Sequence, residues 1–101
     1  MDWWSAYVEA RTDGTGLIED DAVGAFASLA HAHHGVVSAG GEPPRWAAQI
    51  SIEAARADTA ATGAVRIVSA LADQAGLPAW PVARVEATRE DVLAEDLPVP
   101  R

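Results

Sequence analysis

The sequence predicts an α+β fold, because its hydrophobic residues change their spacing along the chain in a definite order. Segments in which apolar and polar residues alternate, as is typical of strands, occur four times. Two segments with a spacing of three to four residues, as is typical of helices, lie between them. The resulting order is strand, helix, strand, strand, helix, strand. It is typical of the ferredoxin-like sandwich, in which two helices cover one face of a four-stranded antiparallel sheet and leave the other face bare.

The first strand and the first helix follow from the pattern of residues 3–34. The strand is predicted over residues 3–10, and its side facing the helices is expected to consist of Trp4, Ala6, Val8 and Ala10. A polar turn with two glycines follows. The helix is predicted over residues 20–34, where acidic residues at its start oppose the positive end of the helix dipole. Gly35 is expected to end it.

A hairpin, a helix and a strand make up the second half. Strands are predicted over residues 36–39 and 45–54, on either side of a Gly/Pro break. The helix is predicted over residues 58–74, with Asp58 as its N-cap and Gly76 after its end. Its buried stripe is expected to consist of Ala61, Ala64, Val65, Val68, Leu71, Ala72 and Ala75. The last strand is predicted over residues 80–87.

These elements predict one ferredoxin-like domain over residues 1–87. Residues 88–101 are expected to form a short helix and an extended tail. The helix is expected because Thr88-Arg89-Glu90-Asp91 resembles a capping box, and the tail because its last residues, Leu97-Pro98-Val99-Pro100-Arg101, contain two prolines.

Composition excludes several classes of function. The chain has 15 Asp and Glu residues against 7 Arg and no Lys, which gives a net charge of −8 at pH 7. Repulsion from phosphate groups argues against direct nucleic-acid binding and against binding to anionic membranes. The absence of cysteine removes disulfides and thiol chemistry. The first residues lack a secretory signal or membrane span, so a cytoplasmic protein is expected, and nothing predicts a cofactor.

The sheet face away from the helices is the best candidate for a functional surface. We predict that its interface residues are Trp3, Tyr7, Trp80, Val82 and Arg84. Contiguous exposed apolar patches usually mark interfaces, and 23 of the 50 hydrophobic residues are Ala, so the core is small and self-association would help to stabilise it. The sequence therefore predicts a non-catalytic interaction or regulatory module. Its expected partner is a second copy of the chain, with another protein as the alternative.

Three histidines near the end of the first predicted helix suggest a second hypothesis. His31 and His34 are three residues apart and could share a helical face, while His33 points elsewhere unless the helix has already ended. Imidazole is a common ligand of nickel, copper and zinc, so the chain could bind a metal ion or another small ligand here. The structural alternative is that histidine favours the negative end of a helix dipole.

A third hypothesis is enzymatic. Small cofactor-free monooxygenases of the dimeric ferredoxin-like type hold substrate between helices and sheet with His, Trp and Asn. This chain offers Trp4, Trp46 and His34 but contains no Asn. No nucleophile motif is present either, so no catalytic residue is assigned and a non-enzymatic role is expected.

Four stretches of the chain also resemble a family of small actinobacterial proteins. They are His34-Gly35-Val36-Val37-Ser38, Pro44-Arg45-Trp46-Ala47-Ala48-Gln49-Ile50-Ser51-Ile52-Glu53-Ala54, and Ala75-Gly76-Leu77-Pro78 with Trp80-Pro81-Val82-Ala83-Arg84-Val85-Glu86. The resemblance extends over residues 3–97. In that family the module often precedes an excisionase-type helix-turn-helix segment, which is absent from this sequence. The resemblance therefore implies a regulatory or assembly module without direct DNA binding, and it implies no catalytic residues.

Overall fold

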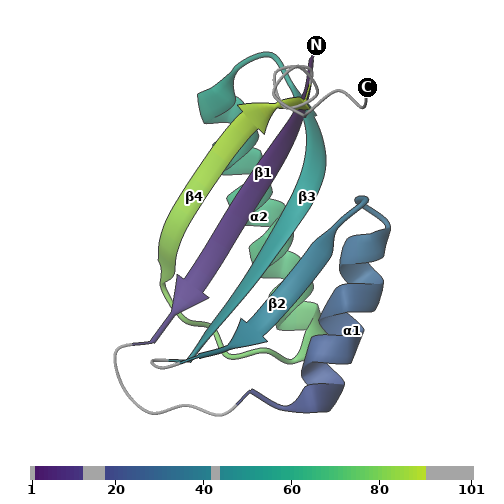
Figure 1. The fold of residues 1–101 in the computed structure, drawn as a ribbon, viewed down its shortest axis with the longest axis vertical. Coiled ribbons are helices and arrows are strands. Elements are labelled where there is room, and N and C mark those ends of the chain that lie inside the picture. Colours follow the sequence, from purple (N-terminus) through teal and green to yellow (C-terminus); the bar gives the residue numbers. More distant parts are fainter. Residues whose placement is uncertain (1, 13–17, 42–43, 91–101) are drawn as a thin grey trace, which may run out of the picture.

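The structure is a computed structural model that describes residues 2–12, 18–41 and 44–90. Its elements, in chain order, are β1 (Asp2–Arg11), α1 (Asp20–His31), β2 (Val36–Gly40), β3 (Arg45–Ala54), α2 (Ala57–Ala75) and β4 (Val82–Arg89) (Figure 1). The predicted α+β class and element order are confirmed. Neither helix in the described part is apolar enough along its length to cross a lipid bilayer.

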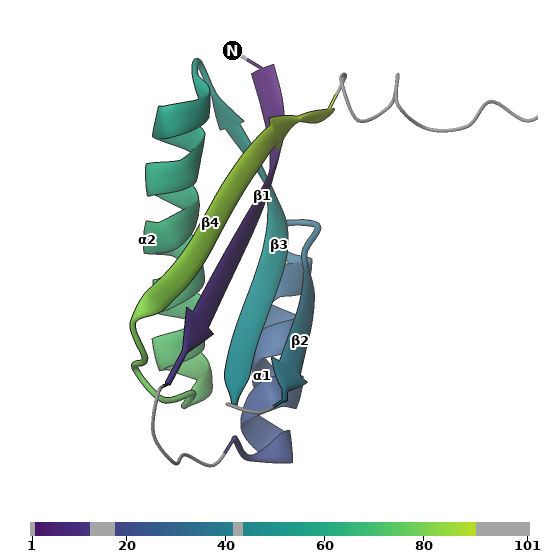
Figure 2. The same ribbon diagram turned by 60° about the vertical axis from the view of Figure 1, so that its left-hand side comes forward.

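The four strands form one antiparallel sheet in the order β2-β3-β1-β4. Strands β1 and β3 lie in its centre and pair along their whole length, from Asp2 opposite Ala54 to Arg11 opposite Arg45. Both helices lie on the same side of the sheet, as Figure 2 shows. The opposite face, called the open face below, is not covered by any helix among the described residues.

Small side chains let the helices pack closely on the sheet. The core is centred on Phe26 of α1, whose ring meets Trp46 of β3 edge to face, with centroids 5.6 Å apart. Alanines fill most of the remaining space, including Ala6, Ala10, Ala30, Ala48, Ala64 and Ala72. A Cβ added to Gly63 of α2 would lie 2.8 Å from Ile52 Cδ1, so this helix lies close to β3, and an alanine here would require the end of the Ile52 side chain to move.

Helix α1 ends at His31, three residues before its predicted end. The turn that follows is closed by the backbone N–H of Gly35, which donates to the carbonyl of Ala30 at 2.9 Å. His34 takes the left-handed conformation, with φ of 55°. Gly35 is required for a different reason: a Cβ there would lie 2.8 Å from the Ala30 carbonyl oxygen. The prediction that Gly35 ends the helix was therefore wrong: the helix ends earlier, and Gly35 belongs to the turn that follows it.

Helix α2 begins at Ala57, after Arg56, so the prediction of Asp58 as N-cap was wrong. Asp58 lies in the first turn, where acidic residues also oppose the helix dipole. Its Oδ1 accepts a hydrogen bond from the backbone N–H of Thr59 at 2.9 Å. The fully buried positions of the helix, four residues apart, are Ala60, Ala64, Val68 and Ala72.

Strand β4 begins at Val82 and not at Trp80, and it continues to Arg89. The sheet therefore extends two residues past the predicted boundary at residue 87. Thr88 and Arg89 belong to this strand, so the short helix does not begin at Thr88. The remaining residues of the predicted helix and tail, 91–101, lie outside the described residues.

Candidate functional site

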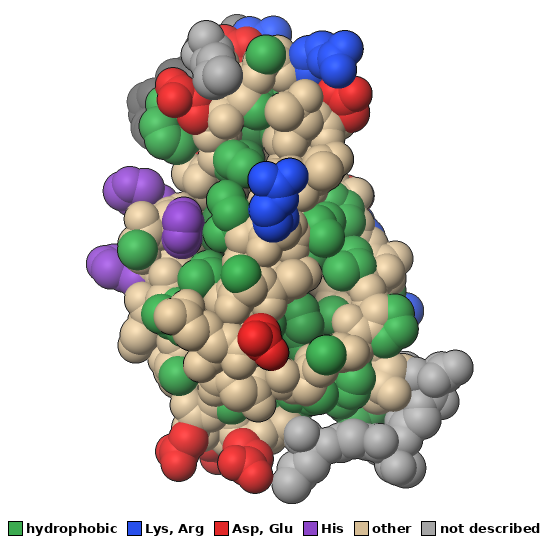
Figure 3. Space-filling view, turned by 180° about the vertical axis from the view of Figure 1, so that it is seen from behind, with side chains coloured by type: hydrophobic (Ala, Val, Ile, Leu, Met, Phe, Trp, Pro, Cys, Tyr) green, Lys and Arg blue, Asp and Glu red, His purple; other side chains and the backbone are tan. Residues whose placement is uncertain are grey.

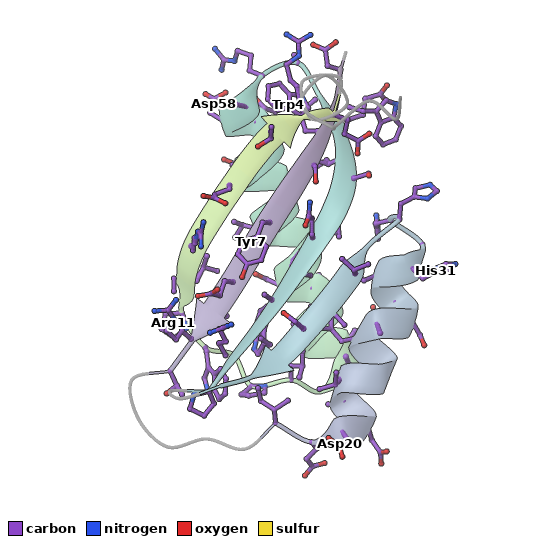
Figure 4. The ribbon with its side chains drawn as sticks, in the orientation of Figure 1. Trp4, Tyr7, Arg11, Asp20, His31 and Asp58 are labelled. Atoms are coloured by element: carbon purple, nitrogen blue, oxygen red, sulfur yellow. The ribbon has the colours of Figure 1, made fainter. Side chains whose placement is uncertain are left out.

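The open face carries fewer aromatic and more polar side chains than the predicted interface. Of the five predicted interface residues, Trp3, Tyr7 and Arg84 lie on it, with Tyr7 near the middle of the sheet in Figure 4. Trp3 is 51% exposed. The neighbouring positions on β1, β3 and β4 are polar or charged: Ser5, Glu9, Gln49, Ser51, Glu53 and Glu86. A polar outer face is typical of a sheet with one face in water.

Trp80 does not belong to the open face. It lies before β4 and packs, half-buried, against the core on the helix side of the sheet. Its placement follows from the chain path after α2. The helix ends at Gly76, and Leu77 then returns to the core. Counting in steps of two residues backwards along β4 reaches Trp80, but residues 80 and 81 do not pair with another strand.

Val82 is displaced from the open face by a shift in register. Val85 pairs with Val8 and Arg84 with Glu9, but the next pair joins Val82 to Ala10. One residue of β4, Ala83, is therefore extra at this point, as in a β-bulge. Directly paired residues share a face of the sheet, and Ala10 is fully buried on the helix side. Alternation therefore fails between Arg84 and Val82.

A buried carboxylate organises one end of the open face. Glu9 is only 3% exposed, although it lies on the side of the sheet that faces water. Its Oε1 accepts a hydrogen bond from Tyr7 Oη at 2.6 Å, and its Oε2 accepts one from Arg11 Nε at 3.1 Å. Arg11 Nη2 also donates to Oε2, and Arg45 Nε lies 3.8 Å from Oε1. Each carboxylate oxygen thus has a donor or a positive charge beside it, which is what a buried charge requires.

These contacts shift the pKa values of both acidic groups. The hydrogen bond from Tyr7, followed by the one from Arg11, holds the pKa of Glu9 below its usual value, although desolvation acts in the opposite direction. The same hydrogen bond raises the pKa of Tyr7, because losing the phenol proton would break the bond and place a second negative charge beside the carboxylate. Glu9 is therefore ionised and Tyr7 neutral at neutral pH.

The network continues to the edge of the sheet through Arg84. Its guanidinium carbon lies 5.6 Å from the centroid of the Tyr7 ring, which is within the range of a cation–π contact. Its Nη2 lies 2.8 Å from Glu86 Oε1 on the same strand. The open face thus carries an ordered row of alternating charges that ends on β4. Sequence reasoning missed the burial of Glu9; the available signal was that Tyr7 and Arg11, two residues before and after it on the same strand, share its face of the sheet.

Within the described part of the chain, the three histidines are not gathered with other ligands into a group that could hold a metal ion. With α1 ending at His31, His31 and His34 do not share a helical face. The backbone carbonyl of His33 accepts a hydrogen bond from Ser51 N at 3.0 Å, so this turn connects α1 to β3. Figure 3 shows histidine side chains as separate groups at the surface. Within residues 2–12, 18–41 and 44–90, no three His, Asp or Glu side chains are placed to hold a metal ion.

The residues of the enzymatic hypothesis are not gathered around one cavity. Trp4 and Trp46 belong to different core clusters, and each indole N–H already donates to a backbone carbonyl, of Ala54 at 2.9 Å and of Pro78 at 3.0 Å. His34 instead lines a separate pocket of about 250 Å³ with Trp3, Ser51 and Glu90. A pocket of about 150 Å³ at the other end of the molecule contains Trp46 but no histidine.

Comparison of the chain with protein-family models, with curated proteins and with solved structures gave no match in any of the three. The resemblance to actinobacterial regulatory modules therefore stays a prediction. Function has to be argued from the geometry of the described residues.

Proposed function

We propose that this chain is a non-catalytic interaction module with a ferredoxin-like topology, which self-associates through an exposed edge of its sheet. The topology is supported by the element order and by the strand order β2-β3-β1-β4, in which each helix connects two strands on the same side of the sheet. Self-association is supported by the surface that the sheet leaves unpaired. The strongest part of that surface is the edge strand β4.

Strand β4 has an accessible outer edge. It is the last strand of the sheet, and no described strand pairs with its outer side. Six of its eight residues are exposed. Exposed edges of this length attract further strands, and proteins usually shorten them, cover them or interrupt them with proline or lysine. Val82–Arg89 contains neither proline nor lysine, so beyond the irregularity at Ala83 its charged side chains control what can pair with it.

The sequence of β4 is complementary to itself when reversed, and this is the observation that carries the proposal. In an antiparallel pair with a twofold axis through Val85, Arg84 would lie opposite Glu86 of the partner subunit, and this pairing would occur twice. Ala83 would lie opposite the partner's Ala87. Opposite charges in directly facing positions stabilise strand pairs, and a twofold axis requires this kind of self-complementary surface. The product is one continuous sheet of eight strands, four from each copy.

The network around Glu9 prepares this edge for pairing. Tyr7 holds the Arg84 guanidinium over its ring, and Glu9 in turn fixes the Tyr7 hydroxyl. Arg84 is thereby partly ordered before a partner arrives, which reduces the entropy lost on association. Face-to-face packing through Trp3 and Tyr7 is the alternative arrangement. It is disfavoured because the open face is largely polar and lacks Trp80 and Val82.

A charge swap tests the proposal. The solution mass, measured by size exclusion with light scattering over a range of concentrations, should approach twice 10.5 kDa. Arg84→Glu should favour the monomer, because two Glu side chains would then face each other across the interface. The double variant Arg84→Glu with Glu86→Arg should restore the dimer. A monomeric wild-type chain at every concentration would contradict self-association, and would leave another protein as the partner.

A further inference from the structure

The pocket of about 150 Å³ lies at the C-terminal end of α2, on the helix side of the sheet. Its apolar lining includes Trp46 and Leu77, which are buried, and Pro78 and Trp80, which are half-buried. Ser69 and Asp73 of α2 add polar atoms. An engineered protein cavity of roughly this volume is known to hold benzene. The pocket is therefore large enough for one small organic molecule.

Backbone and indole hydrogen bonds fix the walls of this pocket. The indole N–H of Trp46 donates to the carbonyl of Pro78 at 3.0 Å, which joins the β3 side to the segment after α2. The N–H of Leu77 donates to Ala72 at 2.9 Å, across Gly76, and the N–H of Trp80 donates to Pro78 at 2.9 Å. The walls thus exist before a ligand arrives, which reduces the cost of ordering them on binding.

The pocket lies beside a carboxylate and beside the negative end of a helix dipole. Asp73 lies on the last turn of α2 and lines the pocket. The C-terminal end of a helix carries partial negative charge, which basic residues commonly offset. The last turn of α2, which the structure describes in full, contains none. Arg11 donates its backbone N–H to Pro81 nearby, but its guanidinium is bound to Glu9.

We propose that this pocket binds a small organic cation of the alkylammonium class. Its alkyl groups would contact the apolar lining, chiefly the half-buried indole of Trp80 with Trp46 behind it, and its charge would be balanced by Asp73 and by the carbonyl end of α2. Tryptophan is the aromatic side chain that attracts such cations most strongly. A metal ion fits the pocket poorly, because it requires several oxygen or nitrogen ligands and the wall is mainly apolar. The proposal requires no second copy of the chain and is independent of self-association.

Nuclear magnetic resonance of the four indole N–H groups provides a direct test with tetramethylammonium chloride as the probe. The resonances of Trp46 and Trp80 should shift and reach saturation. Trp3 and Trp4 serve as internal controls because they lie far from the pocket. Trp46 pairs with Ala10 of β1, and Trp4 is six residues from Ala10, or about 20 Å along the strand. Sodium chloride at equal concentration controls for ionic strength, and tert-butanol provides a neutral molecule of similar shape.

Two variants separate the contribution of charge from that of the aromatic wall. Asp73→Asn should weaken binding several-fold, whereas Asp58→Asn, at the other end of the same helix, should leave it unchanged. Trp80→Leu keeps an apolar wall but removes the π system, and should weaken binding by about two- to thirtyfold. Equal shifts with tert-butanol, shifts shared by all four indoles, or full binding by Asp73→Asn would each overturn the proposal.

Discussion

Tyr7 donates a hydrogen bond of 2.6 Å to the carboxylate of Glu9, two residues further along the same strand. Residues two apart on a strand share a face, so the contact requires no change in the chain path. It turns the exposed side of the sheet into an ordered charge network, because Arg11 is fixed by Glu9 and Arg84 lies over the Tyr7 ring. The four predictions below test this network, the turn after α1 and the proposed interface.

Replacing Glu9 by Gln should destabilise the fold. The variant keeps the size of the side chain but removes the negative charge that Arg11 and Tyr7 contact. We expect a loss of about 1–3 kcal/mol in the free energy of unfolding, measured with urea. Glu53→Gln changes an exposed carboxylate on β3 and should change the free energy of unfolding by less than about 0.5 kcal/mol. Equal effects of the two variants would show that Glu9 is not specially bound.

Acid should weaken the protein through the same carboxylate. Because the pKa of Glu9 is lower in the folded chain, its contribution to stability is complete above the unfolded pKa, near 4.5. The contribution should disappear as the pH falls through the folded pKa. Urea unfolding between neutral pH and acid should therefore show a smaller loss of stability for Glu9→Gln than for the wild type. Parallel curves for the two proteins would contradict the assignment.

Two glycines, Gly35 in the turn after α1 and Gly24 within α1, provide a matched pair of substitutions. Gly35→Ala should destabilise, because its Cβ would lie 2.8 Å from the Ala30 carbonyl oxygen and 3.0 Å from Ile50 Cγ2. Gly24→Ala, on an exposed part of α1 with no neighbouring atom within 4 Å, should stabilise by about 0.5–1 kcal/mol. Thermal unfolding of the two variants should give shifts of opposite sign. A neutral Gly35→Ala would show that the turn can relax at little cost.

The proposed pairing through β4 predicts that a substitution on the open face, away from the outer edge, leaves the dimeric solution mass unchanged. Trp3→Glu introduces a charge at a residue that is 51% exposed and lies on central strand β1, not on the outer edge. If copies pair through β4, this variant should keep the dimeric mass that Arg84→Glu reduces. Loss of the dimer in Trp3→Glu, with Arg84→Glu unaffected, would instead favour face-to-face packing. Circular dichroism of both variants would check that the fold is retained.

Local patterns predicted the elements well because each depends on nearby residues. The buried face of β1 alternates strictly, and Trp4, Ala6, Val8 and Ala10 are all buried as expected. The element order then restricts how the segments can pack. The composition of the open face was harder to predict, since it depends on pairing between strands. The register places Val82 opposite Ala10, and this relationship is invisible within β4 alone.

The sequence by itself determined the class of fold, the order of its elements and the side of each central strand that meets the helices, because hydrophobic burial follows the period of the backbone. Only the tertiary structure decided where Trp80 packs, which residues after α1 take the left-handed conformation, and that Glu9 is buried on the open face. Each of these depends on contacts between segments far apart in the chain. Glu9 is the clearest case: its charge predicts exposure, but Tyr7, Arg11 and Arg45 provide donors and positive charge that make its burial favourable.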